Sequence, residues 1–177
     1  MEIIKNHYKR SDDVLAYADI REDVEELKKF IIEADKKREC YCIHHAQVSE
    51  DPWNFFVIHP RWVLGDDRLF EHQVIINPKI IDHVDIERAS FEKLKIADTP
   101  ANRKWWANFD LAGKWVSEGC MSFPFRQPKK VYRYYQINVE YYDNKFQLHK
   151  TRLVGTAAQI FQHEVLHGQG KNIYFLK

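Results

Sequence analysis

The sequence has few cysteines, almost no net charge and no long hydrophobic run, and each absence excludes a class of protein. Three cysteines among 177 residues are too few, and odd in number, for a disulfide framework. The 27 basic and 26 acidic side chains leave a net charge of +1, without the basic excess of a strong nucleic-acid binder. No apolar run approaches the roughly 18 residues of a membrane span, and the first residues lack the apolar segment of a signal peptide. We therefore expect a cytoplasmic, monomeric protein without DNA or membrane partners, folded as a single domain over residues 1–177.

Hydrophobic periodicity predicts an α+β fold. Val24, Leu27, Ile31 and Ala34 recur at helical spacing within Glu22–Arg38, which indicates an amphipathic helix. A second helical period predicts a late helix over Thr151–His167, with Gly168 as its C-terminal cap. Alternating or apolar stretches predict the strands, which are Cys40–Gln47, Asn54–Ile58, Arg68–Ile76, Val131–Tyr142 and the hairpin return Lys145–Lys150. Strands followed by one strong helix favour α+β over a doubly wound parallel sheet.

The late helix carries the pattern H-E-x-x-H, as His163-Glu164-Val165-Leu166-His167. Side chains four residues apart share one face of a helix, so both imidazoles can reach one metal ion. Glu164 lies beside them, where it can take a proton from a metal-bound water. The alternative is two surface histidines that flank an exposed glutamate.

A catalytic metal usually has three protein ligands, so one more is needed. The metzincin pattern requires a histidine six residues beyond the motif, where Ile173 stands, and no Glu, Asp or His follows His167. The third ligand must therefore come from upstream. The candidates are His44, His45, His59, His72, His149 and the cysteines, among which Cys120 stands beside a glycine that permits close backbone approach.

Two motifs together resemble those of the peptide deformylases. Glu118-Gly119-Cys120-Met121-Ser122 is similar to their E-G-C-L-S, and Gln162–His167 is similar to their Q-H-E-x-D-H, with Leu166 in place of the acid. Ile76-Asn77-Pro78 resembles the short N-P strand end that precedes the cysteine motif in the family. The resemblance covers most of the chain and implies antiparallel or mixed sheets wrapped around a central H-E-x-x-H helix.

The resemblance also implies an activity and a set of roles. The substrate would be an N-formylmethionyl nascent peptide, cleaved to formate and a free N-terminus. Cys120, His163 and His167 would bind Fe²⁺, with Zn²⁺, Ni²⁺ or Co²⁺ as substitutes, and Glu164 would be the general base and then the general acid. The Gln47 amide and the Met121 backbone N–H would hold the oxyanion. The residues implied to contact the peptide are Tyr41, Cys42, Gly119 and Arg126.

The first family motif, G-x-G-x-A-A-x-Q, is heavily altered in Cys40–Gln47. Cysteines replace both glycines at positions 40 and 42, and His44 and His45 replace the alanines. These changes leave open a reshaped substrate wall, a second metal site or a redox-sensitive pocket. The alternative that we favour is a repacked core strand that keeps only Gln47 and the backbone contacts. Leu166 likewise removes a carboxylate that can orient a metal ligand, unless another acid replaces it.

Residues 82–117 form a longer stretch than the family usually has, and we interpret them as an insertion. Their aromatics, Trp105, Trp106, Phe109 and Trp115, are equally consistent with a lid over the peptide site and with an excursion that packs on itself. Because the family's C-terminal ribosome-docking extension has no counterpart before Lys177, we expect weak ribosome docking.

Two other functions compete with deformylation. The altered first motif is also consistent with a related metal amidohydrolase or peptidase that selects another acyl group or an unblocked N-terminus. The segment Lys129–Tyr135 interleaves basic and aromatic residues, as a strand that stacks single-stranded RNA does. The near-zero net charge instead favours a half-buried strand with its aromatics packed inward.

Overall fold

A computed structural model describes residues 1–4, 9–37, 40–65, 68–84 and 115–176. The helices are α1 (Arg21–Lys37), α2 (Arg61–Leu64) and α4 (Gly155–Gly168), with short 3-10 turns at Tyr17–Asp19, His45–Gln47 and Ile173–Phe175. The strands are β1 (Cys42–His44), β2 (Phe55–Ile58), β3 (Val74–Val84), β4 (Trp115–Glu118), β5 (Lys129–Tyr132), β6 (Gln136–Tyr142) and β7 (Leu148–Val154). Within these residues no helix is both long and apolar enough to cross a membrane.

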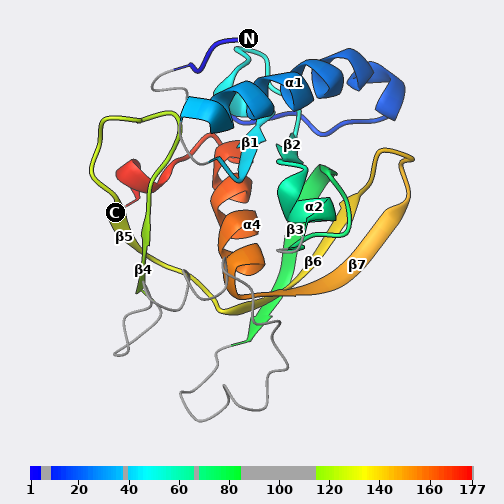
Figure 1. Cartoon of the computed structure of the whole chain (residues 1–177). Coiled ribbons are helices and arrows are strands. Elements are labelled where there is room, and N and C mark those ends of the chain that lie inside the picture. Colours follow the sequence, from blue (N-terminus) through cyan, green and yellow to red (C-terminus); the bar gives the residue numbers. More distant parts are fainter. Residues whose placement is uncertain (5–8, 38–39, 66–67, 85–114, 177) are drawn as a thin grey trace.

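Two antiparallel sheets enclose α4, as expected for the α+β class. The larger sheet has the order β1-β2-β3-β6-β7, and the smaller one pairs β4 with β5. In Figure 1 α4 stands in the middle of the molecule, between the β4–β5 ribbon and the larger sheet, while α1 runs across the top. The metal-binding motif is therefore placed on the innermost helix.

Alternation along the strands divides the core into two layers. Phe56 and Ile58 of β2 pack on the α4 side of the sheet, whereas Phe55 and Val57 pack on the α1 side. The face of α1 predicted from its period, Val24, Leu27, Ile31 and Ala34, is the face that is buried in this second layer. A third cluster joins Val116, Val131, Cys120 and Ile173 between the small sheet and the C-terminal segment.

The predicted strand Val131–Tyr142 is confirmed only in part, because the chain changes sheets within it. β5 ends at Tyr132 and β6 starts at Gln136. Between them Arg133 turns inward to Glu118, and the Gln162 side chain hydrogen-bonds both the N–H and the C=O of Tyr134. At this bend the Gln162 side chain thus takes the hydrogen bonds that a neighbouring strand would otherwise supply. Hydrophobic periodicity cannot predict such a partner.

Other element boundaries also differ from prediction. Of the expected strand Cys40–Gln47 only Cys42–His44 is a strand, and the hairpin return is Leu148–Val154 and not Lys145–Lys150. The strand expected from Arg68 begins at Val74, and the helix expected from Thr151 begins at Gly155, after β7 has continued to Val154. Asn77-Pro78 does not end a strand but lies at a register shift inside β3, where Asn77 has a φ of 49°. Its side chain there bonds both the N–H and the C=O of Val14, which anchors the N-terminal segment.

The C-cap of α4 is Gln169, and the glycine that ends the helix is Gly170, one residue later, and not Gly168. Gly170 adopts a φ of 73°, its N–H bonds the His167 carbonyl, and the Lys171 N–H bonds that of Leu166, which together form a Schellman motif. Gly168 is required for close packing, because a Cβ at that position would lie 2.7 Å from Asn54 Oδ1.

The expected insertion is only partly described. Residues 82–84 complete β3 and residues 115–117 belong to β4, while residues 85–114, with Trp105, Trp106 and Phe109, lie outside the described residues. Trp115 is half exposed and meets Tyr132 edge-on. The single-domain prediction and the insertion stay predictions.

Candidate metal centre

Three possible metal ligands from two distant segments meet at α4. His163 and His167 lie one turn apart on the helix, with their Nε2 atoms 3.2 Å apart. Cys120, just after β4, brings its Sγ to 3.4 Å from His167 Nε2. All three donor atoms lie within 4.8 Å of one another. The upstream third ligand expected from sequence is therefore placed where a single ion could touch all three residues.

This donor set suits a divalent transition metal. One thiolate and two imidazoles are typical of zinc and of iron rather than of magnesium or calcium, which take oxygen ligands. Cys120 is buried, and so is His167, whose pKa is lowered by burial and by the neighbouring His163. A neutral imidazole is the form that binds a metal. The residues thus fit the metal that the sequence motifs imply.

Glu118 and Arg133 form a buried charged pair behind the histidines. Arg133 donates two hydrogen bonds of 2.8 Å to the Glu118 carboxylate, which also lies 2.9 Å from His163 Nδ1. Burial opposes the ionised carboxylate, but its bond to His163 and the Arg133 charge lower the pKa of Glu118. Burial also opposes a charged His163, yet its bonds to Cys120 and Glu118 raise its pKa to about 10. The carboxylate therefore fixes the ring with Nε2 toward Cys120, and a metal bound at Nε2 would take the place of the proton held there.

Glu164 projects to the other side of the cluster and meets Cys42. The Cys42 thiol donates to Glu164 Oε1 at 2.9 Å, across 122 residues of sequence. Glu164 Oε2 is buried and has no hydrogen-bond partner among the described residues. Burial raises the pKa of Glu164, so its carboxylate is a stronger base than an exposed one. A buried, half-satisfied carboxylate beside a metal centre is suited to proton transfer.

Gln47 places a side-chain amide against the cysteine turn. Its Oε1 accepts the His44 N–H, which fixes the amide, and its Nε2 lies 3.2 Å from Ser122 Oγ and 3.9 Å from Cys120 Sγ. Met121 is half-buried and packs against the core layer on the α1 side of the sheet. The Gln47 amide is therefore brought to the turn that contains Met121, and the oxyanion role of the two residues stays a prediction.

The four residues expected to contact the peptide lie in four different settings. Cys42 reaches Glu164, as described, and Gly119 is exposed next to Cys120. The Tyr41 ring stacks on Trp62 at 4.5 Å. The Arg126 guanidinium lies over the rings of Phe123, Tyr174 and Phe175. Their contact with a peptide stays a prediction.

The altered first motif is packed into the core. Cys40 and Cys42 are buried free thiols, and His44 is fully buried with its Nδ1 accepting the Ala46 N–H. In the described part of the chain, neither group of three or more possible metal ligands includes these residues. The favoured interpretation, a repacked strand that keeps Gln47 in place, agrees with this packing. Leu166 likewise packs with the apolar cluster around Val116 and Ile173.

Sequence reasoning missed the residues that support the ligands. Glu118 was part of the recognised motif but had no role, and Arg133 was grouped with a possible RNA-binding strand. Arg133 is instead buried against Glu118, and Tyr135 is buried too, so only part of this segment, with Lys130 and Tyr132, is exposed. The only available signal was the acidic residue two positions before the cysteine, since the partner lies 15 residues away on another segment.

Known relatives are similar over much of this arrangement. The peptide deformylase of Christiangramia forsetii is 29% identical over 128 residues, which is 67% of this chain and 52% of that protein. The peptide deformylase of Streptococcus gordonii is 28% identical over 102 residues, which is 58% of this chain and 38% of that protein. The aligned part of the chain thus spans about half the length of these curated relatives, or less.

Solved structures share the fold. The crystal structure of peptide deformylase from Thermotoga maritima has a TM-score of 0.63 at 23% identity, covering 94% of this chain and 87% of that one. The deformylase of the Vibrio parahaemolyticus bacteriophage VP16T, in complex with actinonin, has a TM-score of 0.64 at 21% identity and covers 98% and 100%. A sequence profile described as Polypeptide deformylase matches residues 5–175. On this match over almost its whole length, the chain belongs to the peptide deformylase family.

Proposed function

We propose that the protein is a metal-dependent hydrolase that removes the formyl group from N-formylmethionyl peptides and releases formate. The observation that carries the proposal is the convergence of Cys120, His163 and His167 next to a buried Glu164. Membership of the peptide deformylase family supports the same reaction. Fe²⁺ is the metal that the resemblance favours, with Zn²⁺, Ni²⁺ or Co²⁺ as substitutes. The cytoplasmic location, the monomeric state and the weak ribosome docking stay predictions.

Each residue near the centre has a part in this reaction. When bound, a divalent metal supplies a Lewis acid that polarises the formyl carbonyl and acidifies water. Glu164 takes the proton of the attacking water and passes it to the nitrogen of the leaving amine. The Gln47 amide and the Met121 N–H donate hydrogen bonds to the oxygen that becomes negative. Water and formamide thereby give formate and a free N-terminus.

Formate release from formyl-Met-Ala-Ser tests the proposal. Protein is purified without oxygen, its metal content is measured, and formate is followed with time. We expect turnover in the wild type and a loss of about 10²–10⁴-fold in Glu164→Ala with the metal retained. A smaller loss, of about 10²–10³-fold, is expected for Gln47→Ala. A metal-loaded wild type that releases no formate would refute the assignment.

A second candidate function follows from Cys42. The family motif has a glycine there, whereas this chain directs a thiol onto Glu164 at 2.9 Å. A side chain in that position changes the space beside the reacting carbon, which favours a metal amidohydrolase or peptidase with a different acyl or N-terminal preference. Formyl-, acetyl- and unblocked Met-Ala-Ser are compared in the wild type and in Cys42→Gly. Faster cleavage of either other peptide by the wild type would favour this second function.

A further inference from the structure

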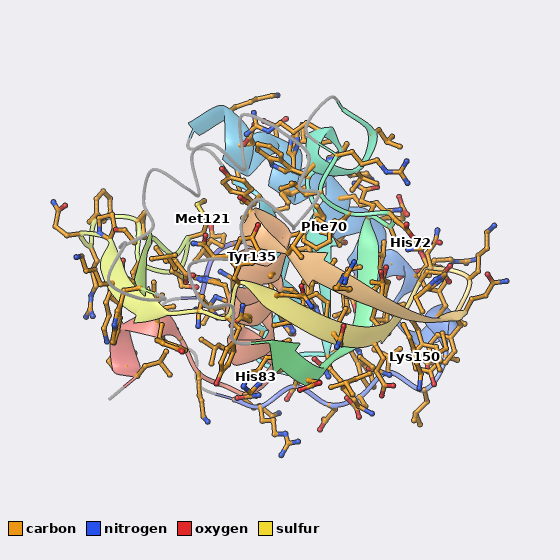
Figure 2. All side chains as sticks on the ribbon, turned by 90° about the horizontal axis from the view of Figure 1, so that it is seen from below. Phe70, His72, His83, Met121, Tyr135 and Lys150 are labelled. Carbon is orange, nitrogen blue, oxygen red and sulfur yellow. The ribbon has the colours of Figure 1, made fainter. Side chains whose placement is uncertain are left out.

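A second group of possible metal ligands lies away from the catalytic centre. His72, in the loop before β3, faces Asp143 and His149, which belong to the β6–β7 hairpin. Their donor atoms also lie within 4.8 Å of one another. Figure 2 shows His72 and Lys150 on one side of the molecule and Met121, next to Cys120, on the other. The two clusters are therefore separate sites.

The distances within this cluster are close to those of a metal site. Asp143 Oδ2 lies 2.9 Å from His149 Nε2 and 3.8 Å from His72 Nε2. Zinc bonds of about 2.0–2.1 Å in a tetrahedron place neighbouring ligand atoms about 3.4 Å apart. To reach that value, the distance from Asp143 to His149 would lengthen and the distance from Asp143 to His72 would shorten, each by a few tenths of an ångström. The two imidazole rings already lie 4.1 Å apart between centroids.

Neighbouring groups hold these ligands in place. Tyr141 Oη lies 3.0 Å from His72 Nδ1, which leaves Nε2 of that ring facing Asp143. Asp143 Oδ1 accepts the N–H groups of Lys145 and Gln147, so Oδ2 is directed at the histidines. Such outer contacts are a regular feature of metal-binding histidines and carboxylates. The cluster thus has fixed ligands that come from two separate segments.

The charges of the cluster suit a divalent cation. The Asp143 side chain is only 5% exposed, and those of His72 and His149 are 26% and 27% exposed. Burial, together with the nearby His149, lowers the pKa of His72, which keeps its imidazole neutral and able to bind. Burial opposes the ionised Asp143, but hydrogen bonds from the Gln147 backbone and His149 lower its pKa. One carboxylate and two imidazoles form a donor set for Zn²⁺, Cu²⁺ or Ni²⁺ rather than for Mg²⁺.

We propose that His72, Asp143 and His149 bind a second divalent transition metal, of the zinc type, which joins the loop before β3 to the β6–β7 hairpin. Both histidines bind through Nε2, and Nδ1 of His72 keeps its contact with Tyr141 Oη. A water completes the tetrahedron at the partly exposed side.

Cobalt distinguishes the two sites. Metal-free protein is titrated with Co²⁺, and bound metal is counted by mass spectrometry of the native protein. Only the Cys120 site contains sulfur, so only that site gives a thiolate-to-cobalt charge-transfer band. We expect the wild type to bind two ions per chain, with this band complete after one. Cys120→Ser is expected to lose the band and to keep one ion.

The variants His149→Gln and His72→Gln change two separate segments, so misfolding of one leaves the other as a test. Both are expected to bind one ion with the charge-transfer band intact, and His83→Gln, an exposed histidine stacked on Tyr134, is the control that keeps two. Tyr141→Phe is expected to weaken only the second ion, by about 10-fold or more. A wild type that binds a single ion, or two ions retained in both histidine variants, would overturn the proposal. Neither outcome depends on deformylase activity.

Discussion

Cys40, just before β1, and Cys42, its first residue, do not have the chemistry of reactive thiols. Burial raises the pKa of Cys40 to about 12, and burial together with Glu164 holds that of Cys42 well above its ordinary value. The thiolate is the form that reacts, and it is scarce at both positions at neutral pH. We therefore expect neither thiol of the folded protein to react with iodoacetamide at pH 8, while the unfolded chain is alkylated at all three cysteines. Peptide mapping by mass spectrometry measures this, and rapid labelling of Cys42 in the folded state would contradict it.

Glu118 and Arg133 form a buried ion pair. Removing one partner is expected to lower the free energy of unfolding by more than the intact pair adds to it. Arg133→Met leaves a buried carboxylate without its cation, and we expect a loss of about 3–5 kcal/mol in the free energy of unfolding. Metal affinity should fall as well, since Glu118 also fixes His163. Urea unfolding and metal titration measure the two effects. Arg152→Met, on the exposed side of the edge strand β7, is the matched control and should change either quantity little.

His44 makes stability dependent on pH. Complete burial and the nearby His45 lower its pKa to about 3, below the ordinary value of 6.5. The unfolded chain therefore binds a proton at this histidine first, so stability present above pH 6.5 is lost as the pH falls toward 3. Between pH 6.5 and pH 5 this amounts to about 2 kcal/mol. Urea unfolding with a chelator present should show a smaller pH slope in His44→Gln than in the wild type, although His45 and His167 add to the slope in both. Equal slopes would exclude this role.

At the scale of elements, the end of α4 depends on two glycines with different requirements. Gly168 is needed because Asn54 and His44 approach its Cα closely, whereas Gly170 is needed for its left-handed backbone. Gly168→Ala forces a methyl group to 2.7 Å from Asn54 Oδ1, and we expect a loss of about 1–3 kcal/mol. Adding Asn54→Ala should recover part of it, because the obstructing oxygen is then gone. Melting temperatures of the two single variants and the double variant measure the coupling; simple additivity would show that the contact is not the cause.

The sequence predicted an element well where that element buries a single apolar face. The period of α1 identified its buried residues because a surface helix buries a single stripe. Prediction was confirmed only in part at 131–142, where the alternation continues although Arg133 and Tyr134 leave the strand to meet Glu118 and Gln162. The histidine pair and Cys120 were recognisable because helical spacing and a paired motif are local. The thiol on Glu164 and the His72 cluster were not, since both depend on contacts between segments far apart in sequence.

At the scale of the whole molecule, the catalytic metal would also stabilise the fold. Its ligands come from the end of β4 and from α4, so an ion that binds only the folded chain shifts unfolding by mass action. With free metal at about 1,000 times its dissociation constant, the expected stabilisation is about 4 kcal/mol. Calorimetry with added Zn²⁺, and again after a chelator, measures the change in melting temperature. Measured in the His149→Gln background, which removes the second proposed site, Cys120→Ser should lose most of this response, and a response unchanged by that substitution would show that the metal acts elsewhere.

The contact between Cys42 and Glu164 bears on when, during synthesis, the candidate site can form. It joins β1, from the first third of the chain, to the last helix, across 122 residues. Contacts over such separations form late in folding, because the intervening chain must first be ordered. On a ribosome, the β1 and β4 segments leave the exit tunnel before α4, and α4 carries both histidines and the base. The proposed activity therefore requires α4 to have left the tunnel, and a nascent chain that lacks α4 has no part of it.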